Sequence, residues 1–272
     1  MKTVLRLLGL LLLALLSLQI YFAARIVLMR WVDPESTSFQ RSEAARLVTS
    51  TGRLMWRQQW VPYSKIAHTL KRAVIASEDA SFTEHDGVDL EALEKAWEKN
   101  QKAEQLARQQ AERLAQQAKR KAAQQKAQGQ VASTPPPAPP PAPAAKIIGG
   151  STITQQLAKN LFLSGERTLV RKTQELVLTF MLEAFLSKQR ILEIYLNSVE
   201  WGEGVYGAAA ATEHYYRTEP QRLQALQAAR LAVMLPAPRR FEKLPQSPYL
   251  SARAETIAAR MPAVQLPEEA RP

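Results

Sequence analysis

The sequence predicts a mainly α-helical protein that is tied to a membrane by a single N-terminal helix. Residues 7–24 are almost entirely apolar, and several later segments carry apolar residues at helical spacing. No segment shows the sustained two-residue alternation of a β-strand. The chain has 272 residues and no cysteine. Once the anchor and a low-complexity stretch are set aside, it has room for one core without disulfides, which leaves the redox compartment open.

The first element is the membrane anchor, which we place in residues 1–30. Its apolar run lies between Arg6 and Arg25, and residues 26–29 prolong it toward the roughly 20 residues that span a bilayer. A cleaved signal peptide is the alternative, because the chain starts with basic residues. The run is longer than the usual apolar region of about 7–15 residues, so we predict an uncleaved anchor. Basic residues on both sides keep the positive-inside rule from fixing its orientation.

Two segments connect the anchor to the first chemically informative motif. Residues 31–55 are predicted to be a polar connector with short helical pieces. The aromatic cluster at 56–63 fits either the membrane interface or packing against the core. Residues 66–76 then carry apolar side chains at helical spacing, so Glu78 lies at or just past a helix end. A carboxylate held there against a cleft wall can have a raised pKa and act as a base.

Residues 100–146 have a different composition and form an insert in the predicted domain. The part up to residue 130 is rich in Gln, Ala, Lys and Arg without an apolar stripe, so it is a solvated helix or a fluctuating chain; residues 135–143 form a polyproline II spacer. Eight Lys and Arg residues against two Glu give the insert a net charge of +6, out of +11 for the chain. This charge favours an anionic membrane surface as partner, or no partner at all; nucleic acid is excluded as a poor match for an anchored chain.

The segment after Gly149 and Gly150 places hydroxyls, amides and a cation at a helix start. Unpaired backbone N–H groups at a helix start attract anions, so residues 151–160 predict a phosphate-binding site. The alternative is that Thr152 and Gln155 form an ordinary capping box, which the same spacing fits.

The remaining segments supply core helices. Apolar spacing and stop signals place them at residues 171–186, 188–197, 204–211, 223–235 and 252–261. In the first of these, Lys172 and Glu175 are three residues apart, so they can also be an ordinary exposed ion pair on the helix surface.

Five motifs, in order along the chain, resemble the peptidoglycan glycosyltransferases, which polymerise lipid-linked disaccharide into glycan strands. The first two are Glu78-Asp79-x-x-Phe82-x-x-His85-x-Gly87-x-Asp89 and Gly150-Ser151-Thr152-x-x-Gln155-Gln156-x-x-Lys159-Asn160. The other three are Arg171-Lys172-x-x-Glu175, Lys188-x-x-Ile191-Leu192-Glu193-x-Tyr195-Leu196-Asn197, and Gly202-x-Gly204-Val205-Tyr206-Gly207 leading to Tyr215-Tyr216. The resemblance covers residues 56–240. Because the sequence has no Ser-x-x-Lys of a penicillin-binding transpeptidase, we expect a monofunctional biosynthetic enzyme of glycosyltransferase family 51.

The resemblance implies a lysozyme-like domain of two lobes around a groove, in residues 56–99 and 147–262, followed by a tail at 263–272. It implies inverting transfer, in which the 4-hydroxyl of lipid II attacks the anomeric carbon of a lipid-linked glycan and lipid diphosphate leaves. Glu78 is implied as the base, and Glu175 as a second catalytic carboxylate that orders cations or aids the transition state. The implied substrate-binding residues are Asp79, Phe82, His85, Ser151, Thr152, Gln155, Gln156, Lys159, Asn160, Arg171, Lys172, Lys188 and Asn197.

A divalent cation, Mg²⁺ or Mn²⁺, near Asp79 or the diphosphate is compatible with the family, although no ligand cluster in the sequence demands one. His85 and His214 lack metal-ligand spacing and are interpreted as structural. The implied partners are lipid II, the lipid-linked glycan chain, the membrane and other cell-wall synthesis proteins. The implied location is the bacterial inner membrane, with the catalytic domain in the periplasm.

Two other classes of function remain as alternatives. A lysozyme-like peptidoglycan hydrolase would share the fold and use a glutamate as acid, but it has no need for so many cations beside the cleft. A non-catalytic membrane scaffold would leave both glutamates and the cations without a role.

Replacing residues 101–145 with a short Gly/Ser linker is expected to leave thermal stability and turnover in detergent nearly unchanged. Lengthening a flexible loop costs only about 0.6 kcal/mol per doubling. The deletion removes five net positive charges, so binding to anionic vesicles should weaken. The measurement is vesicle cosedimentation of the anchorless domain, with and without the insert, at low and high salt. Equal binding by both forms would contradict a membrane role for the insert.

Overall fold

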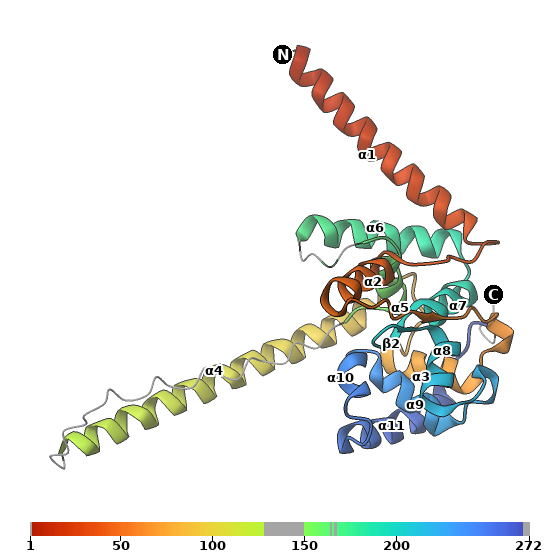
Figure 1. Ribbon diagram of the computed structural model, residues 1–272. Coiled ribbons are helices and arrows are strands. Elements are labelled where there is room, and N and C mark those ends of the chain that lie inside the picture. Colours follow the sequence, from red (N-terminus) through yellow and green to blue (C-terminus); the bar gives the residue numbers. More distant parts are fainter. Residues whose placement is uncertain (1, 128–149, 164, 166–167, 269–272) are drawn as a thin grey trace. The chain divides into compact units, whose positions relative to one another are not determined.

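The computed structural model describes residues 2–127, 150–163, 165 and 168–268 (Figure 1). The chain divides into two compact units: residues 1–88 together with 151–272, and residues 89–150. All residues with a predicted catalytic or substrate-binding role lie in the first unit. In the described ranges this unit is built mainly from helices, as the sequence predicts.

Helix α1 (Lys2–Leu28) is the one described helix that is long and apolar enough to cross a membrane. Most of its side chains are exposed, whereas Ile26 near its end is fully buried. Side-chain contacts join the C-terminal part of α1 to the rest of the unit. The amides of Gln19 and Gln174 exchange hydrogen bonds of 2.9 and 3.1 Å, and the rings of Phe22 and Phe162 meet edge to face at 5.3 Å.

The predicted polar connector contains one continuous helix, α2 (Ser38–Thr51), in place of the expected short pieces. Thr37 caps this helix with a capping box to Gln40, and Gly52 ends it with a φ of 67°. Gln40 is completely buried and donates from its side chain to the carbonyl of Ser198 at 2.9 Å. The connector is therefore packed into the unit through a specific polar contact.

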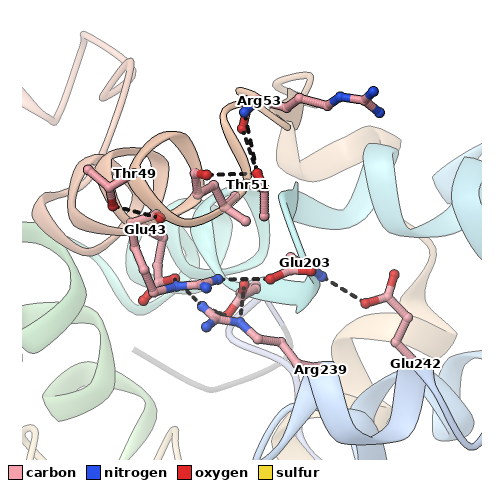
Figure 2. Close-up of polar contacts among 10 residues, drawn as sticks. Glu43, Thr49, Thr51, Arg53, Glu203, Arg239 and Glu242 are labelled. Atoms are coloured by element: carbon pink, nitrogen blue, oxygen red, sulfur yellow. Dashed lines mark hydrogen bonds and ion pairs between the residues drawn. The ribbon is translucent and has the colours of Figure 1, made fainter.

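A network of charges ties α2 to the C-terminal part of the unit (Figure 2). Arg46 pairs with Glu43 of its own helix at 2.6 Å and with Glu203 at 2.9 Å. Arg239 pairs with Glu43 at 2.5 Å and with Glu200 at 3.0 Å. Burial raises the pKa of Glu200, and Arg239 partly opposes this effect. In Figure 2 the side chain of Arg53 points away from this network.

The core helices pack in two groups. In one group, α3 (His68–Glu78) lies against α9 (Ala225–Met234), and α11 (Pro248–Arg260) contacts both. In the other, α5 (Ile153–Phe162) packs against α6 (Leu169–Phe185) and α2. The other described helical elements of the unit are η1 (Tyr63–Lys65), α7 (Lys188–Ser198), α8 (Gly207–Tyr216), η2 (Pro220–Arg222), α10 (Pro238–Glu242) and η3 (Met261–Ala263).

Three short strands form a sheet that the sequence did not reveal. The order is β1 (Arg57–Gln58), β3 (Val205–Tyr206), β2 (Glu200–Gly202), with β1 parallel and β2 antiparallel to β3. Strands of two or three residues are too short to show alternation. The helix expected from residue 204 begins three residues later, because Gly204 has a φ of 73° and turns the chain between β2 and β3. A Cβ on Gly204 would lie 2.5 Å from the carbonyl oxygen of Met55.

The aromatic cluster at 56–63 contributes to packing. Tyr63 is buried, Trp60 packs against the core, and the ring of Trp56 lies 5.2 Å from that of Tyr206. Of the two interpretations left open by the sequence, the structure favours the core contact.

The second unit contains α4 (Leu90–Ala127), a helix of 38 residues. The Gln/Ala/Lys/Arg-rich segment is thus helical as far as residue 127, which resolves its two alternatives in favour of a helix. Surface pairs such as Glu104–Arg108, at 2.6 Å, lie four residues apart along it. Each such pair contributes only about 0.3–0.5 kcal/mol. The proline-rich segment 135–143 lies outside the described residues. The predicted boundaries of the insert at 100 and 146 stay predictions.

Replacing Asn197 with alanine is expected to destabilise the domain. Its side chain is completely buried; it accepts from the N–H of Val61 at 2.8 Å and donates to the carbonyls of Val61 and Glu193 at 2.9 Å each. Leaving these groups unpaired costs about 1–3 kcal/mol, or roughly 2–10 °C in melting temperature for a domain of this size. Thermal denaturation measures the effect. The control is Gln189→Ala, on the exposed face of the same helix. If both variants have the same melting temperature, this role of Asn197 is wrong.

Candidate active site

Glu78 is the last residue of α3 and carries the site's first carboxylate. Its Oε2 accepts a hydrogen bond of 3.0 Å from the side-chain amide of Gln156, and its Oε1 accepts a longer one, 3.4 Å, from the hydroxyl of Ser77. The apolar spacing of α3 explains this position: the buried face ends at Ala76, and Glu78 follows at the helix end, where it is only partly exposed.

The surroundings of Glu78 suit a base. Loss of hydration by burial raises the pKa of its carboxyl above the usual value. Hydrogen bonds from Gln156 and Ser77 act in the opposite direction, and the neighbouring charge of Asp79 adds to the rise. A carboxylate with a raised pKa holds a proton more strongly, so it is better matched to accepting one from a hydroxyl at neutral pH.

A buried tyrosine orients the amide that contacts Glu78. Tyr195 is completely buried on α7, and its hydroxyl donates to Oε1 of Gln156 at 2.9 Å. This bond turns the NH₂ group of Gln156 toward Glu78. Burial, and then the charges of Glu78 and Asp79, raise the pKa of Tyr195 well above its usual value, so it remains a donor. Tyr195 is part of the quoted motif, but no local pattern assigns it this role, because its contact with Gln156 joins residues 39 positions apart.

The second carboxylate, Glu175, lies among cations on α6. Arg171 donates to its Oε2 at 2.8 Å, and the ammonium of Lys172 contacts its Oε1. Glu175 is only 4% exposed, so the alternative of an ordinary exposed ion pair is wrong. A buried carboxylate with two cationic partners is a fixed charge around which the cations are arranged.

Lys159, on α5, belongs to the same cluster. Loss of hydration lowers the pKa of its ammonium although much of the side chain remains exposed; Glu175 opposes this effect, and the cations Arg171 and Lys172 reinforce it. An anion bound beside Lys159 would favour its charged form again.

Helix α5 connects the two carboxylates. Gln156 contacts Glu78, and Lys159, three residues later, interacts with Glu175. Residues three apart in a helix are neighbours on one face, about 5–6 Å apart at Cβ. The two carboxylates are therefore arranged along one face of α5, between α3 and α6.

The start of α5 differs from the phosphate-binding site that the sequence predicted. Thr152 and Gln155 form the capping box: each side chain accepts from the other's backbone N–H, at 3.2 and 3.1 Å. The N–H of Ile153 donates to Asp79 at 2.9 Å, and the hydroxyl of Thr152 donates to the carbonyl of Gly87. Because these donors are already used, the helix start is not an open anion site, and the capping-box alternative is correct.

Asp79, His85 and Gly87 form a loop that holds this helix start. One Asp79 oxygen accepts from Ile153, and the other lies 2.9 Å from Nε2 of His85. The N–H of Gly87 donates to Nδ1 of His85, so Nε2 carries the proton that bonds Asp79. Gly87 has a φ of 89°, and a Cβ there would lie 2.7 Å from Thr179. These contacts agree with the interpretation of His85 as a structural residue, and not with the substrate-binding role that the resemblance implied.

A metal ion held by Asp79 would have to replace hydrogen bonds that this side chain already makes. Both of its oxygens already accept hydrogen bonds, whereas Mg²⁺ and Mn²⁺ prefer several free oxygen ligands. The requirement of the reaction for a divalent cation stays a prediction.

Three more of the predicted substrate-binding residues have structural surroundings instead: Phe82, Lys188 and Asn197. Lys188 pairs with Glu183 at 2.8 Å, donates to the carbonyl of His85 and lies 4.7 Å from the centre of the buried Phe82 ring. Asn197 is completely buried among backbone groups, so it is not available to a ligand. Glu183 was not found from the sequence, because no motif marks it. Ser151 is exposed, and Asn160 is partly exposed on α5.

A carboxylate with a raised pKa, beside a cluster of cations, defines a site that can deprotonate a hydroxyl and stabilise an anionic leaving group. The family model described as Transglycosylase matches residues 46–133 and 144–262. The chain therefore belongs to the transglycosylase family. The model leaves only residues 134–143 unmatched between the two segments, a shorter gap than the predicted insert.

Several proteins named biosynthetic peptidoglycan transglycosylase are similar to this chain along most of their length. The protein of Burkholderia thailandensis is 47% identical over 254 residues, which cover 93% of this chain and 84% of that protein. The protein of Paraburkholderia xenovorans is 44% identical over 94% of this chain and 90% of its own length. The protein of Bordetella pertussis is 45% identical over 92% and 88%.

Replacing Gln156 with leucine is expected to move the acid limb of the pH–rate profile to higher pH. The amide favours the charged form of Glu78, so its loss raises the pKa of that carboxyl further. A base works only when deprotonated, so activity is then lost at a higher pH as the solution is acidified. The measurement is kcat/KM against pH for glycosyl transfer. The control is Gln189→Leu; a limb that stays in place or moves to lower pH in Gln156→Leu would contradict the contact.

Proposed function

We propose that this protein polymerises lipid II into the glycan strands of peptidoglycan, by inverting glycosyl transfer with release of lipid diphosphate. One observation carries the proposal. A single face of α5 joins Glu78, a carboxylate with a raised pKa, to a cluster of cations around the buried Glu175. The names of the relatives agree with this substrate class.

Glu78 acts as the base. The 4-hydroxyl of the incoming disaccharide is a weak nucleophile, and a carboxylate that takes its proton during attack contributes about 10²–10⁴-fold. The bond formed is from this oxygen to the anomeric carbon of the growing chain, and the bond broken is from that carbon to the diphosphate oxygen. Attack from the side opposite the leaving group inverts the anomeric carbon. Gln156 and Tyr195 hold the base in position.

The cation cluster stabilises the leaving group. Lys159, Arg171 and Lys172 surround the single carboxylate of Glu175, which leaves two positive charges uncompensated. As the glycosidic bond breaks, negative charge grows on the diphosphate, and preorganised cations lower the barrier to this step. Glu175 serves by fixing the positions of these cations.

The other residues of the motifs fall into two groups, those whose side chains are exposed to a ligand and those held inside the fold. Ser151 and Asn160 are accessible at either end of the same helix segment, and they position sugar or phosphate oxygens. Asp79, His85, Thr152 and the remaining motif residues support the site from behind, through the hydrogen bonds that hold the start of α5.

The proposed location follows from the substrate. Lipid-linked sugars stay at the membrane surface, and α1 packs against α6, the helix that carries Glu175. Because the anchor packs directly against the helix that carries Glu175, it keeps the site close to the membrane surface where the substrate lies. We place the chain in the bacterial inner membrane as a single-pass protein, with the catalytic domain in the periplasm. Other cell-wall synthesis proteins as partners stay a prediction.

Neither alternative function is favoured. Hydrolysis of finished glycan needs no cluster of cations for a diphosphate. A scaffold without catalysis does not need a carboxylate with a raised pKa, and the family match gives no support to either class.

Replacing Glu78 with glutamine is expected to abolish polymerisation while the fold stays intact, because the change keeps the shape of the side chain and removes the base. Turnover should fall about 10²–10⁴-fold. The assay is incubation of the full chain in detergent with lipid II, followed by separation of glycan polymer. The control is Glu84→Gln, an exposed glutamate in the same segment, which should polymerise like wild type.

Three outcomes of this assay decide the proposal. Polymer from wild type, none from Glu78→Gln and unchanged circular dichroism would support it. Near-normal polymer from Glu78→Gln would remove Glu78 from the mechanism. Digestion of finished glycan by wild type, without polymer, would replace the transferase with a hydrolase.

A further inference from the structure

A cavity of about 510 Å³ lies where the anchor joins its unit. It is lined by Arg30, Ala184, Phe185, Leu186, Ser187 and Arg190, which come from the chain just after α1 and from the junction of α6 and α7. None of these residues belongs to the transfer site. Phe185 follows Glu175 by ten residues, about 15 Å along the helix at 1.5 Å per residue. The cavity is therefore separate from the catalytic carboxylates.

Arg30 brings an available positive charge to this cavity. Its Nε donates to the carbonyl of Phe185, the last residue of α6, at 2.6 Å. A helix C-terminus carries partial negative charge, so this bond holds the guanidinium in a favourable place. Within the described part of the chain, no carboxylate pairs with Arg30, and its other four N–H donors have no protein partner.

Arg190 makes the opposite wall rigid. It pairs with Asp33 at 2.6 Å and with Glu193 at 2.9 Å. It also donates to the carbonyl of Met29 at 2.8 Å, and its guanidinium lies 5.4 Å from the ring centre of Trp60. These contacts fix the chain on both sides of Arg30 against α7. Because two carboxylates already neutralise Arg190, the charge left for a ligand is that of Arg30.

The lining of the cavity matches a phosphate that carries apolar substituents. Ser187 is the N-cap of α7, an eleven-residue helix; its oxygen accepts from the N–H of Arg190 at 3.2 Å, which leaves its O–H free to donate. The positive end of α7 favours an anion at the same place. Ala184, Phe185 and Leu186 supply apolar surface beside these donors.

The position of Arg30 along the chain indicates where such a phosphate comes from. The apolar run of α1 is interrupted by Arg25 and prolonged by residues 26–29, so it ends directly before Arg30. The headgroup layer on each side of a bilayer is about 5–8 Å thick. When α1 spans the membrane, the cavity lies in that layer, where lipid phosphates are the most concentrated anions.

We propose that this cavity binds the headgroup of an anionic phospholipid, with Arg30 and the hydroxyl of Ser187 on the phosphate and the apolar wall against the adjoining glycerol. The site would fix the rotation of the domain about its anchor. The proposal depends on α1 spanning a membrane and not on the transferase activity.

The test is calorimetric titration of the full chain in non-ionic detergent with three soluble probes. These are dihexanoyl phosphatidylglycerol, dihexanoyl phosphatidylcholine and inorganic phosphate, each with a protein-free detergent blank. We expect saturable binding of phosphatidylglycerol at one site and clearly weaker binding of the other two. Arg30→Gln should weaken phosphatidylglycerol binding about tenfold or more, since it deletes a charge-assisted contact.

Two further variants make the result specific. Arg53→Gln removes an exposed arginine whose side chain points away from the charge network of α2 (Figure 2), and this variant should bind like wild type. Ala184→Trp fills the cavity from an exposed position without changing charge and should weaken binding as well. Melting temperatures of all variants are compared to confirm folding.

The outcomes that overturn the proposal are distinct. Equal affinity for phosphatidylcholine would remove the preference for anionic lipid, and equal affinity for inorganic phosphate would make this a site for the free ion. Absence of saturable binding, or unchanged binding by Arg30→Gln and Ala184→Trp, would show that the cavity is not a lipid site.

Discussion

The fixed start of α5 is the constraint on which the active site depends. Asp79 accepts the N–H of Ile153, and the capping box of Thr152 and Gln155 satisfies the adjacent donors. Asp79 directly follows Glu78, so one short piece of chain both carries the proposed base and fastens the helix that contacts it. A shift of α5 would therefore move Gln156 relative to Glu78 and Lys159 relative to Glu175 together. This coupling explains why so many motif residues make hydrogen bonds behind the site.

The charges of the site are organised by burial. Glu175 is buried and would be costly without partners, about 3–5 kcal/mol for a buried charge that loses its pair. Arg171, on the same helix, forms an ion pair with this carboxylate, while Lys159 and Lys172 remain exposed enough to contact a ligand. Glu78 has the opposite surroundings: burial raises the pKa of its carboxyl, and the hydrogen bonds from the neutral donors Gln156 and Ser77 only partly oppose this rise. Two carboxylates in one site thus have different tasks because their partners differ.

The long apolar helix α1 and the connector that follows it are packed parts of the enzyme's structure. The end of α1 packs on α6, and α2 packs on α5, so both site helices are supported from the membrane side of the chain. The paired charges of Arg46 and Arg239 then join α2 to the C-terminal region (Figure 2). For an enzyme with a lipid-linked substrate, this packing limits how far the site can turn away from the bilayer.

The sequence by itself determined the helical class, the long apolar N-terminal helix and the position of Glu78 at a helix end. Long apolar runs and helical spacing are local signals, and the motifs are read directly along the chain. The sequence also allowed a capping box at the start of α5, but it could not decide between this capping box and a phosphate-binding site. That decision depends on Asp79, which is 74 residues away from Ile153 and accepts its N–H. Only the tertiary structure decided that Asn197 and Lys188 are held by the fold, that Glu175 is buried, and that Tyr195 orients Gln156. Burial and long-range hydrogen bonds are set by packing between distant segments, and the short strands depend on pairing with partners that no local pattern reveals.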